Sequence, residues 1–328
     1  MKKLALESLK ILFAAGLIYW LLRSGRLSFD GLDELINIQF LPLGFILLCG
    51  NIFFASERWR LLVSIQNLNA KPLGTLRLTL IGLFFNFAMP GGVGGDVVKA
   101  WYFHKDFPDS RVVAVSSVMI DRILGLYAMI LLALSTMLFD LSYIFSIPVL
   151  KALFVVVSLV WLGFSLALVI LFWPRLRESR RFEKLFTLIP LGAKLHKLYH
   201  SLHFYGSNKK LLVAGICLSL LSQFCAIGFL WLVANILNHN PIEFHTIAFV
   251  APLGFITTAL PISPAGIGVG QTAFYYLFNL YTNTTSSLGS VSITAFQIGQ
   301  FCLALIGALL YVMKRQKNES LENLNNLG

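Results

Sequence analysis

Charged residues are scarce in this sequence. They make up 12% of its 328 residues, about half the share of an ordinary soluble domain, whereas hydrophobic residues make up 57%. The mean hydropathy is +0.77. Apolar stretches of membrane-spanning length recur from position 9 to position 313, with no soluble-sized charged insert between them. This pattern leaves no room for a soluble catalytic domain and predicts an all-α integral membrane protein, with residues 1–328 forming one polytopic domain.

Cysteine pairs and nucleotide-binding motifs are also missing. The four cysteines lie in apolar segments without CxxC spacing, so we expect neither a zinc site nor a disulfide framework. The glycine-rich stretch "MPGGVGGD" is not a P-loop, because Lys99 follows Val98 where that motif needs glycine. It is not a dinucleotide fingerprint either, because the position of the third glycine is Val97. We therefore expect no cofactor, no metal and no direct ATP hydrolysis.

The basic residues gather in a few loops. Residues 57–77, residues 174–210 and the tail after 313 are rich in Lys and Arg, whereas residues 140–147, 238–243 and 282–289 have none. The positive-inside rule makes the first three cytoplasmic and the last three external. The net charge of +11 is thus explained by topology, and no nucleic-acid partner is expected. The apolar segments themselves are residues 5–22, 40–56, 78–103, 112–139, 147–173, 211–237, 244–281 and 290–313.

The number of crossings must agree with these sides. Residues 57–77 are cytoplasmic and residues 140–147 are external, and segment 112–139 accounts for the one crossing between them, so segment 78–103 must begin and end on the cytoplasmic side. Segment 244–281 lies between two external loops, so it must begin and end outside. We therefore predict that both are re-entrant hairpins, and that they enter from opposite faces. The other segments give about six spanning helices, with both termini cytoplasmic and the chain in the cell's inner membrane. Irregular backbone at membrane depth must be buried in protein or line a watery cavity. The two broken stretches should therefore face a cavity.

Intramembrane charges single out further residues. Asp121 and Arg122 lie near the middle of segment 112–139, where a charge costs at least about 2.5 kcal/mol. Each either clamps a different broken helix or serves the substrate or a proton directly. Asp96 either caps the second half-helix or forms a polar wall of the cavity. The full set expected at the cavity is Asn86, Pro90, Gly91, Gly92, Gly94, Gly95, Asp96, Lys99, Asp121, Arg122, Pro261, Ser263, Pro264, Gly266, Gly268 and Gln271.

Other polar groups have simpler explanations. Glu57, Arg58 and Arg60 lie at the predicted inner membrane edge, and we interpret them as snorkelling anchors, with phosphate contact as the alternative. The histidines at positions 196, 200 and 203 share one helical face, which could suggest a metal. They belong to the basic amphipathic segment 174–210, which we expect to lie on anionic lipid at the cytoplasmic surface.

Four motifs carry a resemblance to a known family: "RWRLLV" at 58–63, "FNFAMPGGVGGDVVKA" at 85–100, "SSVMIDRILGL" at 116–126 and "PISPAGIGVGQ" at 261–271. In combination they resemble the transmembrane region of bacterial lysylphosphatidylglycerol synthases and its stand-alone relatives. The resemblance implies a flippase-type unit without the cytosolic synthase domain. One position departs from the family pattern: Gln271 stands where the pattern has glutamate, which weakens the case for proton exchange there and for an aminoacyl-lipid substrate.

Three hypotheses of function follow. The leading one is a transporter that moves an anionic phospholipid or a lipid-linked headgroup across the membrane, because half-helix N-termini present positive dipole ends to a midplane cavity. The alternatives are an intramembrane lipid-modifying transferase, with Asp96 and Asp121 as acid or base, and a non-catalytic partner of a lipid or envelope synthase. The expected partners are anionic membrane lipids and a separate lipid-modifying enzyme.

Overall fold

The protein is built from helices. A computed structural model describes residues 41–89, 94–107, 111–173, 192–238 and 241–325, together with Gly16, Tyr19 and Arg23. No strand occurs among these described residues, so the all-α prediction is confirmed. The predicted first span, residues 5–22, lies almost wholly outside them.

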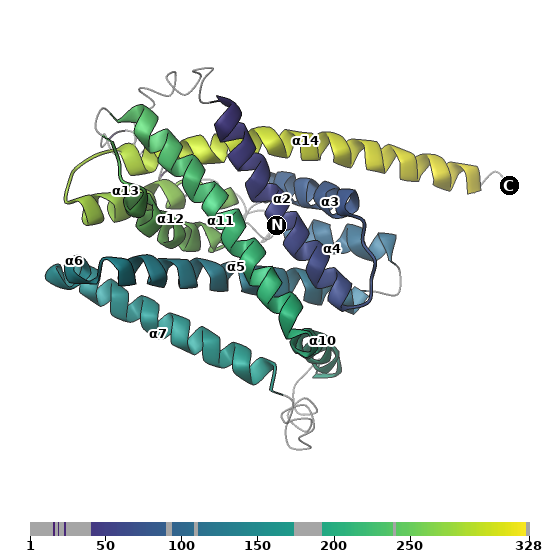
Figure 1. Cartoon of the computed structure of the whole chain (residues 1–328). Coiled ribbons are helices and arrows are strands. Elements are labelled where there is room, and N and C mark those ends of the chain that lie inside the picture. The colour runs from purple at the N-terminus through teal and green to yellow at the C-terminus, as the bar shows by residue number, and fades with distance from the viewer. Residues whose placement is uncertain are drawn as a thin grey trace.

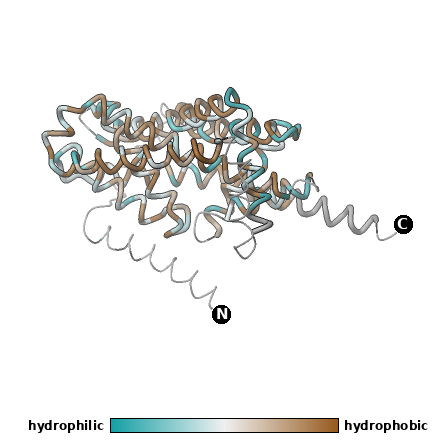
Figure 2. The backbone as a smooth tube through the Cα atoms, turned by 90° about the horizontal axis from the view of Figure 1, so that it is seen from below, coloured by the Kyte–Doolittle hydropathy of each residue, from teal (hydrophilic) through white to brown (hydrophobic). Residues whose placement is uncertain are grey.

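Five long helices are apolar enough to cross a membrane. They are α2 (Leu41–Ile65), α5 (Arg111–Phe139), α7 (Pro148–Leu171), α11 (Lys209–Leu237) and α14 (Leu288–Asn325), whose apolar part ends at Met313. About 20 helical residues cover the 30 Å of a bilayer core, and each of these helices has at least that length. Figure 2 shows brown, hydrophobic backbone along the long helices and teal toward the ends of the bundle. The chain is a multi-pass membrane protein.

Four shorter helices form two hairpins at the predicted places. Hairpin A consists of α3 (Pro72–Ala88) and α4 (Gly94–Asp106), and hairpin B of α12 (Phe244–Ala259) and α13 (Val269–Thr282). Each is too short to cross and return as two full spans. The remaining elements are α6 (Leu141–Ser146), α10 (Gly192–Phe204) and the 3₁₀ turns η3 (Tyr205–Ser207) and η4 (Pro264–Gly266), the last of which lies at the tip of hairpin B.

The hairpins approach from opposite ends of α5 (Figure 1). The base of hairpin A is the end of α4, which the chain joins directly to the start of α5. The base of hairpin B lies at the other end of α5, where Tyr281 Oη donates to Asp140 Oδ2 at 2.5 Å. Tyr143 Oη also donates to the Tyr281 carbonyl at 2.6 Å. This geometry is the one that opposed re-entrant hairpins would have, while the membrane face from which each enters stays a prediction.

Burial separates central helices from peripheral ones. In the most apolar 18-residue window of α11, 44% of residues are buried, against 6% for α7. Helix α7 runs along one edge of the bundle (Figure 1). Helix α11 packs along α2, and reciprocal bonds fix their register: Asn51 Nδ2 donates to the Ser222 carbonyl at 2.9 Å, and Ser222 Oγ donates to the Asn51 carbonyl at 2.9 Å. The hairpins are thus held in a frame whose centre is the α2–α11 pair.

Candidate functional site

A cavity of about 280 Å³ lies where the tips of the two hairpins meet. Hairpin A contributes the end of α3, and hairpin B contributes the end of α12 and the turn η4. Helices α2, α5, α11 and α14 complete the wall. The residues that line this central cavity are Asn51, Leu83, Asn86, Phe87, Arg122, Met129, Gln223, Ala226, Phe255, Thr258, Ala259, Ala265, Ile293, Phe296, Gln297 and Gln300. Arg122 is the one charged residue among them.

Hairpin A is held tight by a close approach of backbones. A Cβ atom on Gly95 would lie 2.0 Å from the Gly82 carbonyl oxygen, so only glycine allows α3 and α4 to pack at this distance. The amide of Gly95 donates to Asn86 Oδ1 at 3.1 Å. Asn86 therefore satisfies one of the free donors at the start of α4. Asp96 is not the N-cap that the sequence suggested, because α4 already begins at Gly94 and Asp96 sits inside its first turn.

The tip of hairpin B needs left-handed backbone. Gly266 has φ +71° and Gly268 has φ +84°, which explains the spacing of these glycines. Pro264 opens the turn η4, which ends at Gly266. Ser263 is fully buried, and Pro261 lies at the exposed side of the break.

Gln271 braces this tip. Its Oε1 accepts from the Gly268 amide at 2.7 Å, and its Nε2 donates to Gln297 Oε1 at 2.7 Å and to Thr294 Oγ1 at 3.2 Å. Gln297 Nε2 in turn donates to the Ala265 carbonyl at 3.2 Å. Gln271 is 2% exposed and is not among the residues that line the cavity. An ionised carboxylate accepts only, so glutamate could not donate these two bonds.

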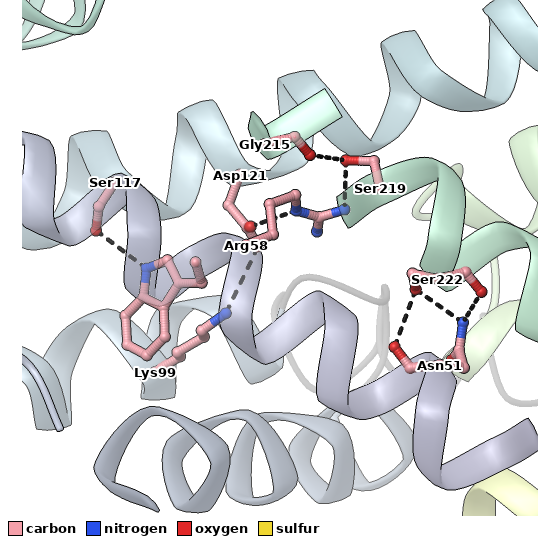
Figure 3. A network of polar contacts seen from close by, with 9 residues as sticks. Asn51, Arg58, Lys99, Ser117, Asp121, Gly215, Ser219 and Ser222 are labelled. Carbon is pink, nitrogen blue, oxygen red and sulfur yellow. Dashed lines mark hydrogen bonds and ion pairs between the residues drawn. The ribbon is translucent and has the colours of Figure 1, made fainter. Parts of the chain in front are cut away.

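Next to the cavity, three charged side chains from three helices meet in the interior (Figure 3). Arg58 Nε of α2 lies 2.7 Å from Asp121 Oδ1 of α5, and Lys99 Nζ of α4 lies 3.6 Å from Asp121 Oδ2. Arg58 Nη1 also donates to Ser219 Oγ at 3.1 Å. Lys99 stands 4.0 Å from the ring centre of Trp59, an attractive cation–π distance. We call Arg58, Lys99 and Asp121 the buried charge cluster.

The cluster corrects the interpretation of Arg58 as a snorkelling anchor. Arg58 is only 8% exposed, and its charge is neutralised by a carboxylate in the bundle rather than by water or headgroups. Glu57 and Arg60 do pair with each other at the helix surface, at 2.7 Å, and their edge position stays a prediction. Removing one partner of a buried pair commonly costs about 3–5 kcal/mol. The cluster therefore ties α2, α4, α5 and α11 together.

Arg122 faces a different direction from its neighbour Asp121, as consecutive helical residues must. Its Nε forms an ion pair with Asp96 Oδ2 of α4. The expectation that Asp121 and Arg122 each clamp a different broken helix is wrong: both reach α4, Asp121 through Lys99 and Arg122 through Asp96. The side chains of Arg122 and Asp96 keep 34% and 21% of their surface exposed, so this pair is more exposed than the buried charge cluster.

Arg122 also lines a second space, an apolar groove of about 640 Å³ between α4 and α5. We call it the lateral groove. Its most exposed walls are Val97 and Trp101 of α4, at 64% and 56%, with Val115 and Met119 of α5 opposite. Asp96 and Arg122 lie at one end, and His104 and Arg111 lie at the other. The groove thus leads along apolar side chains to a guanidinium that also borders the central cavity.

The sequence profile of the lysylphosphatidylglycerol synthase TM region matches residues 8–309. The chain belongs to this family. A UPF0104 membrane protein of Methanocaldococcus jannaschii is 22% identical over an alignment of 313 residues, and the alignment covers 88% of this chain and 91% of that protein. No solved structure matches the chain significantly.

Some residues predicted from the sequence to be functional are not described by the structure or do not come together in it. Pro90, Gly91 and Gly92 fall outside the described residues, so their relation to the cavity stays a prediction. Residues 174–191 of the basic segment 174–210 do too, whereas α10, η3 and the start of α11 are described. His196 Nε2 and His200 Nε2 lie 3.1 Å apart on α10, whereas His203 Nδ1 contacts the Leu171 carbonyl at 2.8 Å. The three rings therefore do not converge on one point.

Sequence reasoning missed the amide side chains of the cavity, namely Asn51, Gln223, Gln297 and Gln300. They lie within the long helices α2, α11 and α14, among mostly apolar neighbours. A signal was present, because buried amides inside apolar spans are costly unless they are bonded.

Proposed function

We propose that this protein moves the headgroup of an anionic phospholipid or lipid-linked phosphate across the membrane through the central cavity. The observation that carries the proposal is the position of Arg122, which borders both the lateral groove and the central cavity. A lipid could leave its acyl chains in the groove and the bilayer while its phosphate reaches this guanidinium. Arginine suits this task because its planar fork binds phosphate oxygens in pairs.

The charges around Arg122 support an anionic ligand. Asp96 is its intramolecular partner, and a lipid phosphate would compete with that carboxylate for the same guanidinium. The pair is partly exposed, so exchange of partners does not require opening the core. The other cations near the site, Arg58 and Lys99, are held by Asp121 and are buried. They contribute structure and leave Arg122 as the cation that faces the cavity.

The lateral groove has the character of an acyl-chain path. It runs from Asp96 to His104 along α4, eight residues or about 12 Å of helix. Apolar side chains that stay exposed, such as Val97 and Trp101, are favourable only against another apolar surface.

The transferase alternative loses support from the ion pairs. Asp121 is locked between two cations and is 8% exposed, so it is poorly placed to exchange protons with a substrate. Asp96 faces Arg122 and is likewise engaged. No specific feature of the described residues favours a purely non-catalytic partner role.

The experiment is leaflet exchange in proteoliposomes. Phosphatidylglycerol with a fluorescent acyl chain is placed in both leaflets, and dithionite bleaches only the outer one. We expect nearly complete bleaching with protein and about half without it. Lipid mass, measured in parallel, distinguishes transport from modification: altered mass would show an enzyme, and neither exchange nor altered mass would contradict both.

Arg122→Gln is the matching variant and Arg60→Gln the control, because Arg60 pairs with Glu57 away from the cavity. Loss of one charge-assisted contact predicts at least about tenfold slower exchange for Arg122→Gln and little change for Arg60→Gln. Both variants are compared only as monodisperse protein with an unfolding temperature near that of wild type. Equal rates for wild type and Arg122→Gln would remove the case for phosphate recognition at this residue.

A further inference from the structure

We propose that the central cavity recognises hydroxyl groups on the transported headgroup, and that Gln223 selects for them. The chemical class is a phosphate carrying a polyol, such as glycerol phosphate or a sugar phosphate, rather than an amine. This inference rests on the proposed function, because it names the substrate of the same cavity. It is carried by a separate observation, the neutral amides that line the cavity opposite Arg122.

Gln223 is the central feature. It lies in the middle of α11, is 6% exposed and lines the cavity. Its Oε1 has no hydrogen-bond partner within the described part of the chain. A buried amide without partners is unfavourable in an apolar surrounding, and natural proteins keep such a group where a ligand or an ordered water meets it. Gln223 lines the central cavity, so a ligand there would lie next to this amide.

In two neighbouring side-chain amides, only one of the two polar groups takes part in a hydrogen bond. Gln300 Nε2 donates to Asn51 Oδ1 at 3.0 Å, and Asn86 Oδ1 accepts from the Gly95 amide at 3.1 Å. Each side-chain amide has a carbonyl and an NH₂ group, so these bonds employ one pole of Gln300 and one pole of Asn86. Within the described part of the chain, Gln300 Oε1 and Asn86 Nδ2 have no hydrogen-bond partner and remain to serve a ligand. The cavity therefore offers acceptors and donors together, without a negative charge.

This combination fits hydroxyl groups better than an ammonium. A hydroxyl both donates and accepts, so it can satisfy either pole of an amide, in whichever orientation Gln223 lies. An ammonium only donates, and it would enter a cavity whose one charged lining residue is the cation Arg122. The volume of about 280 Å³ is several times the roughly 30 Å³ that one water occupies, which gives room for a group of glycerol size.

The test compares two lipids that differ only in the hydroxyls. Phosphatidylglycerol and phosphatidylpropanol, with the same labelled acyl chains, have the same charge and almost the same headgroup length. We expect wild-type protein to exchange phosphatidylglycerol about tenfold faster, the difference made by one buried hydrogen bond with a well-placed partner. Phosphatidylethanolamine should be slower than phosphatidylglycerol as well.

Gln223→Leu links the selectivity to the residue. It removes the amide at similar volume, and we expect phosphatidylglycerol exchange to fall to the phosphatidylpropanol rate, while the phosphatidylpropanol rate stays unchanged. Gln66→Leu is the control, because Gln66 bonds Ser201 at the α2–α10 contact and does not line the cavity. It should keep the wild-type preference. If Gln223→Leu does not fold, Gln223→Met replaces it, and its two exchange rates are compared with those of wild type in the same way.

The outcomes separate the two proposals. Equal wild-type rates for phosphatidylglycerol and phosphatidylpropanol, both above background, overturn hydroxyl recognition and leave lipid transport standing. A preference that survives in Gln223→Leu and Gln223→Met overturns the role of Gln223. Absence of protein-dependent exchange for every lipid overturns the transport proposal and this inference together.

Discussion

Arg58 and Asp121 are 63 positions apart in the chain, and their side chains meet in the interior at 2.7 Å. Lys99 approaches the same carboxylate from α4, so one anion neutralises two buried cations. The arrangement links hairpin A to the α2–α11 frame. It makes this cluster a structural centre of the bundle, next to the cavity but not part of its lining.

Asp121→Asn should therefore destabilise the protein strongly. The substitution leaves Arg58 and Lys99 buried without their anion, and breaking a buried pair costs about 3–5 kcal/mol. The measurement is the unfolding temperature of the detergent-solubilised protein. Glu57→Gln is the control, because it breaks a partly exposed pair within one helix that is worth about 1 kcal/mol or less. An unfolding temperature of Asp121→Asn equal to that of wild type would show that the cluster contributes nothing to stability.

Gly95→Ala should separate the two helices of hairpin A. The added methyl would lie 2.0 Å from the Gly82 carbonyl, which neither backbone can avoid without moving. Overpacking of this kind costs about 1–3 kcal/mol, and here it also moves Asp96 away from Arg122. Gly74→Ala is the matched control, because nothing lies within 4 Å of its added methyl. Unfolding temperatures and lipid exchange report the effect, and a harmless Gly95→Ala would contradict the close packing.

The hairpins should be labelled from opposite faces of the membrane at their bases. Lys105 at the base of hairpin A and Thr285 beyond hairpin B are both exposed, and they lie at opposite ends of α5. Single cysteines at these positions, in a background without the four native thiols, are treated with an impermeant maleimide on right-side-out and inverted vesicles. We expect Lys105→Cys to react from the cytoplasm and Thr285→Cys from outside. Labelling of both from one face would reject the opposed arrangement.

Much of the fold was readable because its signals are local. Prolines and glycines act on their own segment of backbone, and they predicted the helix breaks that separate α3 from α4 and α12 from α13. That the two hairpins are re-entrant, which rests on the distribution of Lys and Arg, stays a prediction. The cost of charge in a membrane marked Asp121 and Arg122 as interior residues with partners. Their partners were not predictable, because pairing depends on which helices become neighbours.

Arg58 shows this limit most clearly. Its position in "SERWRLL" is that of an ordinary membrane-edge arginine, like Arg60 two residues later. Two residues on a helix differ by about 200°, so one side chain faces the bundle while the other faces outward. Which of these two faces of α2 points into the bundle depends on where α5 and α11 lie, and the local sequence does not contain that information. The amide of Gln223 was missed for a similar reason, because its importance comes from a cavity assembled by six helices and the turn η4.

Neutralising the Asp96–Arg122 pair in two steps separates its structural role from its proposed transport role. Arg122→Gln leaves Asp96 without its cation, and Asp96→Asn in the same chain then removes the stranded charge. Because both side chains are partly exposed, we expect the double variant to be more stable than Arg122→Gln by only about 1 kcal/mol. Exchange of phosphatidylglycerol should stay lost in the double variant, since no guanidinium remains at the cavity for the phosphate.

Asp96→Asn alone keeps Arg122 and removes the competing carboxylate, so half-maximal exchange should need less phosphatidylglycerol than in wild type. Unfolding temperatures and exchange rates across a series of phosphatidylglycerol fractions give both readouts. Recovery of exchange together with stability in the double variant would show that Arg122 serves the fold and not the lipid.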